Sequence, residues 1–446
     1  MTASLAPPHR ILMTLDAVGG VWRYAMDLAA ALGGQGAEIV FTGFGPEPSE
    51  AQREEAEAIG RLEWQAAPLD WLASGPDELA EVPRLIEGLV RRHDVDLVHL
   101  NLPSQAAGLK VSVPVVVVSH SCVVTWFQAV RGHDVPGEWA WQKRLNAEGL
   151  ARADAVVVPS RSHGEQVQAA YGPLDRLQVV ANATTVEEVQ PEKQLFAFSA
   201  GRWWDEGKNG CVLDEASVLT DHAVVMAGAT HGPNGEHRHL RHADDRGPLP
   251  HAQVLALMRS AAIFVSPSRY EPFGLAPLEA ARSDCALVLA DIPTYRELWE
   301  DCAIFVDPGD AQGFADAIDQ LCEDHGLRKR LAAMARLRSR AFTPDAQCEA
   351  MLAIYAQAQS RLLETGANDE KDPAPNPSPQ GGGVYSAAPS EHGSGSTEAA
   401  SLSPLVAGSE GRGETRGSPQ KAAARGGSSP NCENHARLTN PTAAAE

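Results

Sequence analysis

Short runs of β-branched residues alternate with longer helical patterns twice along this chain, and this alternation most constrains its fold. The pattern is typical of parallel sheets covered by helices on both faces, because such buried strands are continuously apolar. The expected strands of the first series lie near residues 10–15, 38–42, 96–101, 113–119, 155–159 and 177–180. Those of the second series lie near residues 195–200, 223–227, 262–266, 286–289 and 303–306. The sequence therefore predicts two α/β domains, each a doubly wound, Rossmann-like sheet.

A loop at residues 186–193 separates the two series. We expect a first domain at residues 1–190 and a second at 191–343, followed by a helix at 344–364 that packs back on the first domain. Ligands bind outside the carboxyl ends of the strands in open α/β sheets. Two such domains joined by a short connection are therefore expected to face one cleft that holds a substrate between them.

The composition changes at residue 365. Of the 82 residues from 365 to 446, 46 are Gly, Ala, Pro or Ser, and only six are Ile, Leu, Val, Met, Phe, Trp or Tyr. So little apolar surface does not offset the entropy of ordering a chain. We expect a disordered, low-complexity tail, whether a linker or a regulatory segment.

The charge and the apolar pattern exclude several functions. The net charge is -21, which disfavours a nucleic-acid partner because the phosphate backbone repels an acidic surface. The most apolar segment, 111–124, is interrupted by polar residues, and the N-terminus has no basic stretch before an apolar run, so we expect neither a membrane span nor a signal peptide. The widely spaced cysteines form no C-x-x-C pair, which fits a cytoplasmic protein. They are Cys122, Cys211, Cys285, Cys302, Cys322, Cys348 and Cys432.

Gly19 and Gly20 lie where the first strand leads through a loop into a helix. Glycine lets backbone N–H groups approach a ligand closely, and the positive end of a helix favours an anion. The loop matches neither G-x-G-x-x-G nor the P-loop pattern, so neither NAD nor a P-loop nucleotide is indicated. Taken alone, the segment fits a tight turn equally well.

Glu271 and Glu279 stand eight residues apart in the segment Glu-Pro-Phe-Gly-Leu-Ala-Pro-Leu-Glu. Pro272 extends the chain at Glu271, and Pro277 is tolerated only in the first turn of a helix. A helix is therefore expected to begin near Gly274 or Leu275, with Glu271 ahead of it and Glu279 inside it. The backbone N–H groups of Phe273, Gly274 and Leu275 then lack intrahelical partners and can hold a phosphate. A phosphate between two hydroxyl-binding carboxylates describes a nucleotide sugar.

The Glu271-x7-Glu279 segment, with Gly201-Arg202-Trp-Trp-Asp-Glu-Gly-Lys208-Asn209, resembles the retaining GT-B glycosyltransferases of family 4. The N-terminal Gly-Gly loop and a histidine at the end of an inner strand complete the resemblance, which covers about residues 9–364. It implies a GT-B fold and transfer of a hexose from a nucleotide diphosphate sugar. In this likeness Glu271 contacts the transferred sugar, Glu279 contacts the ribose, and Gly20 contacts the diphosphate or the acceptor.

The same resemblance assigns Arg202 and Lys208 to the diphosphate. Fixed cations there stabilise the charge that develops on a leaving diphosphate more than they stabilise the ground state. No well-placed D-x-D metal site is visible, so these cations are expected to replace Mg²⁺, as the metal independence of the family implies. Retention is ascribed in the family to attack on the front face, with a departing phosphate oxygen taking the proton of the acceptor.

His120 follows the apolar run 113–119. It is either a core histidine or a cleft residue, and the resemblance places it near the donor sugar.

Five histidines between His231 and His251 favour an exposed loop over a metal site, because their spacing is irregular and glycines interrupt them. A group of aromatic and basic residues favours core packing, with an acceptor groove or a contact with a membrane surface as alternatives. The group comprises Trp126, Phe127, Arg131, Trp139, Trp141, Lys143 and Arg144.

The sequence thus predicts a cytoplasmic, retaining hexosyltransferase that needs no cofactor and uses a nucleotide sugar as donor. Its catalytic candidates are His120, Arg202, Lys208 and Glu271. Its donor-binding candidates are Gly19, Gly20, Arg202, Lys208, Phe273, Gly274, Leu275 and Glu279. A nucleotide-sugar epimerase, a phosphorylase and a non-catalytic sugar-binding protein remain alternatives, and the donor nucleotide, the sugar and the acceptor, whether sugar, lipid or small molecule, are left open.

Overall fold

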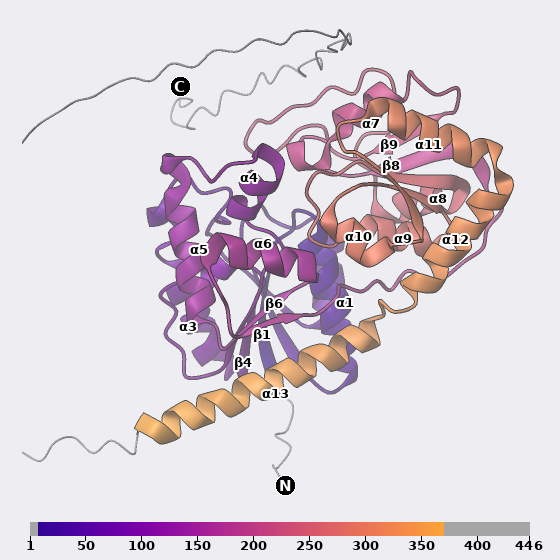
Figure 1. Cartoon of the computed structure of the whole chain (residues 1–446). Coiled ribbons are helices and arrows are strands. Elements are labelled where there is room, and N and C mark those ends of the chain that lie inside the picture. Colours follow the sequence, from indigo (N-terminus) through magenta and orange to yellow (C-terminus); the bar gives the residue numbers. More distant parts are fainter. Residues whose placement is uncertain (1–7, 370–446) are drawn as a thin grey trace, which may run out of the picture. The chain divides into compact units, whose positions relative to one another are not determined.

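The computed structural model describes residues 8–369, with side chains through residue 363, and contains two parallel β-sheets (Figure 1). The first sheet contains the strands β1 (Arg10–Leu15), β2 (Glu38–Gly43), β3 (Arg61–Trp64), β4 (Leu97–Leu100), β5 (Val115–Val118), β6 (Ala155–Val158) and β7 (Leu177–Val179). The second contains β8 (Gln194–Ala200), β9 (Val224–Ala227), β10 (Asp244–Asp245), β11 (Ala261–Ser266), β12 (Ala286–Ala290) and β13 (Ala303–Val306). The prediction of two Rossmann-like α/β domains is confirmed.

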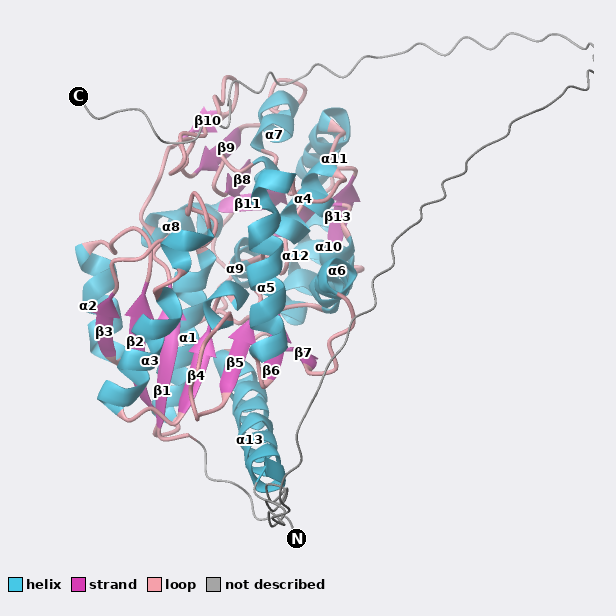
Figure 2. Cartoon of the chain, turned by 90° about the vertical axis from the view of Figure 1, so that its left-hand side faces the viewer, coloured by secondary structure: helices cyan, strands magenta, loops and turns pink. Residues whose placement is uncertain are grey.

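Both sheets follow the same topology. The first has the strand order β3-β2-β1-β4-β5-β6-β7, and the second has the order β10-β9-β8-β11-β12-β13 (Figure 2). The direction of winding reverses between β1 and β4 in the first sheet and between β8 and β11 in the second. Ligands of doubly wound sheets bind at such a reversal, beyond the carboxyl ends of the two strands.

Helices cover both faces of the first sheet. Alternate residues of each strand point to opposite faces, so Ile11 and Met13 pack in one apolar cluster and Leu12 packs in the other. The first cluster includes side chains of α1 (Gly20–Gly34), α2 (Glu50–Ile59) and α13 (Pro344–Asp369), and the second includes those of α3 (Val82–His93), α5 (Ala140–Arg152) and α6 (Arg161–Tyr171). The remaining α-helices are α4 (Val123–Arg131), α7 (Gly210–Ala216), α8 (His251–Ser260), α9 (Leu275–Arg282), α10 (Pro293–Trp299), α11 (Ala311–Glu323) and α12 (His325–Ser339).

The C-terminal helix α13 packs on the first domain although it follows the second domain in the chain (Figure 1). Its residues Met351, Ile354 and Tyr355 are buried in the cluster that contains α1. No helix among residues 8–369 is long and apolar enough to cross a membrane.

The fold differs from the sequence prediction at three places. The strands β3 and β10 were not expected: β3 is only partly apolar, and the two residues of β10 are both aspartates. The final helix continues to Asp369 instead of ending at residue 364, since the first proline after it is Pro373. The predicted disordered tail, 365–446, is therefore wrong for residues 365–369, which belong to α13, and the rest of it lies outside the described residues.

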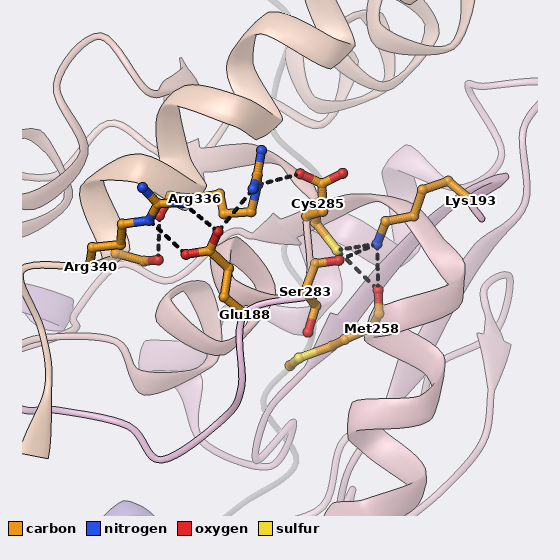
Figure 3. A network of polar contacts seen from close by, with 9 residues as sticks. Glu188, Lys193, Met258, Ser283, Cys285, Arg336 and Arg340 are labelled. Atoms are coloured by element: carbon orange, nitrogen blue, oxygen red, sulfur yellow. Dashed lines mark hydrogen bonds and ion pairs between the residues drawn. The ribbon is translucent and has the colours of Figure 1, made fainter. Parts of the chain in front are cut away.

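The linker between the domains is held to the second domain by ion pairs and partly buried hydrogen bonds (Figure 3). The Glu188 carboxylate accepts hydrogen bonds from Arg336 and Arg340, at 2.9 and 2.7 Å. Lys193 donates from Nζ to the carbonyl oxygens of Met258 and Ser283, at 3.1 and 2.6 Å. The second half of the linker therefore belongs structurally to the second domain.

The pKa of Glu188 is lowered to about 2, first by the hydrogen bond from Arg340 and then by Arg336. A lowered carboxyl pKa contributes stability that is present above the ordinary carboxyl pKa and is lost as the pH falls toward 2. We therefore expect Glu188→Gln to lower the urea midpoint at pH 7, and the difference from the wild type to shrink progressively below pH 5. Glu187→Gln is the matched control, because Glu187 is exposed and adjacent. A difference that stays constant down to pH 3.5 would contradict the role of this charge.

Candidate functional site

The loop after β1 has a backbone that requires glycine. Gly19 caps α1 with φ 112° and ψ -146°, a conformation that essentially only glycine adopts. A Cβ atom on Gly19 would lie 2.9 Å from Nη1 of Arg202, whereas one on Gly20 would lie 3.6 Å from Cδ1 of Leu275. The glycine loop of the first domain therefore contacts the two segments of the second domain that the sequence singled out.

Arg202 follows β8 and extends toward the first domain. Its Nη1 donates to the backbone oxygen of Val18 at 3.3 Å, and its Nη2 donates to Asp205 at 3.4 Å. The guanidinium also lies over the Trp204 ring, 5.4 Å from the ring centroid. The side chain is 39% exposed, so its charge remains accessible to an anion.

Lys208 forms an ion pair with Glu271, and the two side chains are 20% and 15% exposed. They come from the loops that follow β8 and β11, the two strands between which the winding of the second sheet reverses. Lys208 ends a short 3₁₀ turn, and α7 begins two residues later at Gly210. The structure thus brings together one cation and one carboxylate that are 63 residues apart in sequence.

The segment around Glu271 is held by the first domain. The Tyr270 and Thr125 hydroxyls form a hydrogen bond of 2.8 Å, and the Ser160 hydroxyl donates to the backbone oxygen of Pro272 at 2.6 Å. Helix α9 then begins at Leu275, as the prolines predicted, with Gly274 at φ 93°. Among the described residues no acceptor is assigned to the backbone N–H groups of Phe273, Gly274 and Leu275. These donors therefore remain available to an anion beside Glu271.

Glu279 lies inside α9 with an 8% exposed side chain, and its Oε1 is 3.0 Å from Nε2 of His251. This hydrogen bond to a carboxylate is the main reason why the pKa of His251 is raised. His251 is the first residue of α8 and does not belong to the loop in which the sequence placed it. A partly exposed histidine thus orients the carboxylate proposed to bind ribose.

His120 lies two residues beyond β5 and donates from Nε2 to Oδ1 of Asn101 at 2.8 Å. Its ring packs edge-to-face with the Tyr24 ring, with 4.3 Å between the centroids and 70° between the ring planes. Burial lowers the pKa of His120 to about 3, so the imidazole is neutral at physiological pH. Tyr24 lies in the second turn of α1, which connects His120 to the glycine loop.

The predicted residues therefore form two groups linked by α1. Arg202 contacts the Gly19 loop, Leu275 contacts Gly20, and Lys208 contacts Glu271. Within residues 8–369, His120 forms no hydrogen bond or ion pair with Lys208 or Glu271.

Asp16 and Asn101 are polar residues at this edge that sequence reasoning missed. Asp16 follows β1 and is only 4% exposed; burial raises its pKa to about 6, against the opposing charge of Arg202. Asn101 follows β4, the other strand at the reversal of the first sheet. In the sequence, both could have been found as polar residues that directly follow a buried strand.

Two weaker features have structural roles. The histidine loop is exposed at residues 231, 237, 239 and 242, and it is anchored by Asp214, whose carboxylate accepts from the backbone N–H groups of residues 241–243. Within residues 8–369 no cluster of His, Cys, Asp and Glu could hold a metal ion. Trp126 and Arg131 donate hydrogen bonds to Asp205 and Glu206 of the second domain, at 3.0 and 2.8 Å, so this part of the aromatic and basic group contacts the second domain. Its role in an acceptor groove stays a prediction.

Comparison with known proteins bears on the family and the fold. Residues 18–188 match the Glycosyltransferase Family 4 model, and residues 242–338 match the Glycosyl transferases group 1 model. A D-inositol 3-phosphate glycosyltransferase of Xylanimonas cellulosilytica is 28% identical over 392 residues, covering 77% of this chain and 93% of the relative. A glycogen synthase of Mycobacterium tuberculosis is 32% identical over 142 residues, covering 31% of this chain and 33% of the relative.

Solved structures share the fold. The sucrose-phosphate synthase of Thermosynechococcus elongatus has a TM-score of 0.63 at 17% identity, covering 80% of this chain and all of that one. Anabaena HepE, solved with UDP and glucose, has a TM-score of 0.58 at 16% identity, covering 81% of this chain and all of that one. With the two family matches, the doubled Rossmann-like topology and the Glu271–Lys208 pair, the chain belongs to the family 4, group 1 glycosyltransferases of the GT-B fold.

Proposed function

We propose that this protein transfers a hexose from a nucleoside diphosphate sugar to an acceptor hydroxyl, with retention of the anomeric configuration. The observation that carries the proposal is the Lys208–Glu271 pair at the carboxyl edge of the second sheet, beside the start of α9. A bound diphosphate would exchange part of this ion pair for contacts with Lys208 and with the N–H groups that precede α9. Glu271 would then be released to accept hydrogen bonds from sugar hydroxyls.

Charge moves toward the diphosphate when the bond to the sugar breaks. Lys208 and Arg202 are cations held by ion pairs at the carboxyl edge of the second sheet, and we propose that they stabilise that charge from positions close to those they already occupy. Glu279 would accept from the ribose hydroxyls, and His251 would hold its carboxylate in place. For retention we propose attack on the front face, in which a departing phosphate oxygen takes the acceptor proton. The proposed reaction requires no metal ion and takes place in the cytoplasm.

We expect one nucleoside diphosphate among UDP, GDP and ADP to stabilise the full chain strongly. A ligand at a hundred times its Kd contributes about 2.7 kcal/mol to the free energy of unfolding. UDP is the first to test, because HepE was solved with UDP, and D-inositol 3-phosphate is the first acceptor because of the named relative. The measurement is the thermal midpoint with each nucleotide, followed by NMR of the product formed from the matching sugar donor.

A new glycoside with the donor's anomeric configuration supports the proposal. A free epimer would instead identify the protein as an epimerase. A sugar 1-phosphate formed with inorganic phosphate would identify it as a phosphorylase. Tight nucleotide binding without turnover would indicate a binding protein. If no nucleotide shifts the midpoint, the proposed donor class is wrong.

A further inference from the structure

A buried polar chain runs from the C-terminal helix α13 to His120. The Tyr355 hydroxyl lies 2.7 Å from Nδ1 of His99, and Nε2 of His99 lies 3.2 Å from Oδ1 of Asn101. The same amide oxygen lies 2.8 Å from Nε2 of His120. Tyr355 and His99 are fully buried and Asn101 is 1% exposed, so water does not replace these partners.

The orientation of the Asn101 amide is determined by its other contacts. Its Nδ2 donates to the backbone oxygen of Thr14 at 2.5 Å, so Oδ1 must face the two histidines. The backbone N–H of Asn101 also donates to the Thr14 hydroxyl, at 2.8 Å, which anchors the residue at the end of β4. An amide oxygen can only accept, so Nε2 of both His99 and His120 must carry a proton.

A neutral imidazole carries one proton, and that proton determines the role of the second nitrogen. Burial lowers the pKa of His99 to about 4 and that of His120 to about 3, so both rings are neutral at pH 7. Nδ1 of His99 is therefore an acceptor, and the Tyr355 hydroxyl donates to it. Nδ1 of His120 is also an acceptor, and no donor to it is assigned among the described residues.

We infer that Asn101 is a positioning residue that holds His120 as the Nε2–H tautomer, so that its Nδ1 accepts a hydrogen bond from a sugar hydroxyl. The Tyr355 hydroxyl of α13 donates to Nδ1 of His99, and Nε2 of His99 donates to Oδ1 of Asn101. These two hydrogen bonds help to hold the Asn101 amide in its orientation. The tautomer rests on the contacts of Asn101 and on the burial that keeps His120 neutral, whereas the sugar hydroxyl rests on the proposed function.

The tautomer can be measured without any substrate. In the full chain labelled with ¹⁵N at the histidine rings, long-range ¹H–¹⁵N correlation spectra distinguish the two neutral tautomers and the imidazolium. His120→Gln and His99→Gln variants assign the two signals. We expect both rings to carry the proton on Nε2 at pH 7. An Nδ1–H tautomer or an imidazolium at His120 would overturn the inference, whatever the activity of the protein.

The role in sugar binding is tested by Asn101→Leu, which removes the acceptor that selects the tautomer. One hydrogen bond to a neutral hydroxyl is lost in both the ground state and the transition state, so we expect the KM for the donor sugar to rise about five- to tenfold. The expected change in kcat is less than about twofold. Asn101→Asp keeps the acceptor but adds a charge that favours the imidazolium, so its KM should recover as the pH rises.

Gln105→Leu is the matched control. Gln105 is also buried and hydrogen-bonded to Thr14 but does not contact His120, so its loss should lower stability without changing the tautomer or the KM. Equal KM changes in Asn101→Leu and Gln105→Leu would reduce Asn101 to a structural residue. An Nε2–H signal in a protein that turns over no nucleotide sugar would refute the proposed function while leaving the tautomer in place.

Discussion

Lys208→Ala is expected to reduce transfer from the nucleotide sugar by about 100- to 1000-fold, the loss typical of removing one fixed group that stabilises charge in a transition state. Lys208 is the cation that the structure places on Glu271 at the start of α9. Its loss removes charge stabilisation from the departing diphosphate and leaves a largely buried carboxylate unpaired. The measurement is kcat at saturating donor, with the thermal midpoint recorded in parallel.

Lys329→Ala is the matched control for this substitution. Lys329 is an exposed lysine of α12, so its removal should change neither kcat nor the thermal midpoint. If Lys208→Ala retains more than about a third of wild-type turnover, the diphosphate does not use this cation. In that case the site would have to be sought elsewhere on the second sheet.

Gly19→Ala is expected to lower turnover at least tenfold and to destabilise the fold by about 1–3 kcal/mol, the cost of a side chain in a conformation that favours glycine. A methyl group there would also press on Nη1 of Arg202, which a built Cβ approaches to 2.9 Å. Arg202 would have to shift Nη1, the atom that donates to the Val18 carbonyl, and we expect this shift to disturb the position that we assign to it at the diphosphate. Turnover and urea midpoints measure the two effects.

Gly33→Ala separates these effects from a general response of α1 to alanine. Gly33 lies in the same helix, and a Cβ there would meet nothing within 4 Å. Since alanine favours a helix over glycine by about 1 kcal/mol, this variant should be slightly more stable and fully active. A Gly19→Ala protein that behaves like Gly33→Ala would show that the loop tolerates a side chain and that Arg202 is not held by it.

The start of α9 could be predicted from sequence because its causes are local. Pro272 and Pro277 restrict the backbone, Gly274 permits the positive φ of 93° between them, and the helix begins at Leu275 as expected. The glycine loop was predictable for the same reason. By contrast, β10 consists of two aspartates whose strand conformation comes from pairing with β9. The local sequence therefore did not predict this strand.

The pairing of charges could not be read from the chain. Sequence alone placed His251 in an exposed loop, yet it begins α8 and lies 3.0 Å from Glu279, 28 residues away. The aromatic and basic segment around Trp126 had three interpretations, and none of them included its contacts with Asp205 and Glu206 of the second domain. Each of these contacts joins two elements that the topology brings together.

The amino-acid sequence by itself determined the two α/β domains, the strand ends that carry Arg202 and Glu271, and the conformation of the glycine and proline turns. These depend on hydrophobic periodicity and on backbone sterics, which act within a few residues. Only the tertiary structure decided that Lys208 binds Glu271 and that Tyr355 reaches His99 across 256 residues. The strand order and the packing of α13 on the first domain determine these partners. Side chains distant in sequence meet only after the sheets have formed.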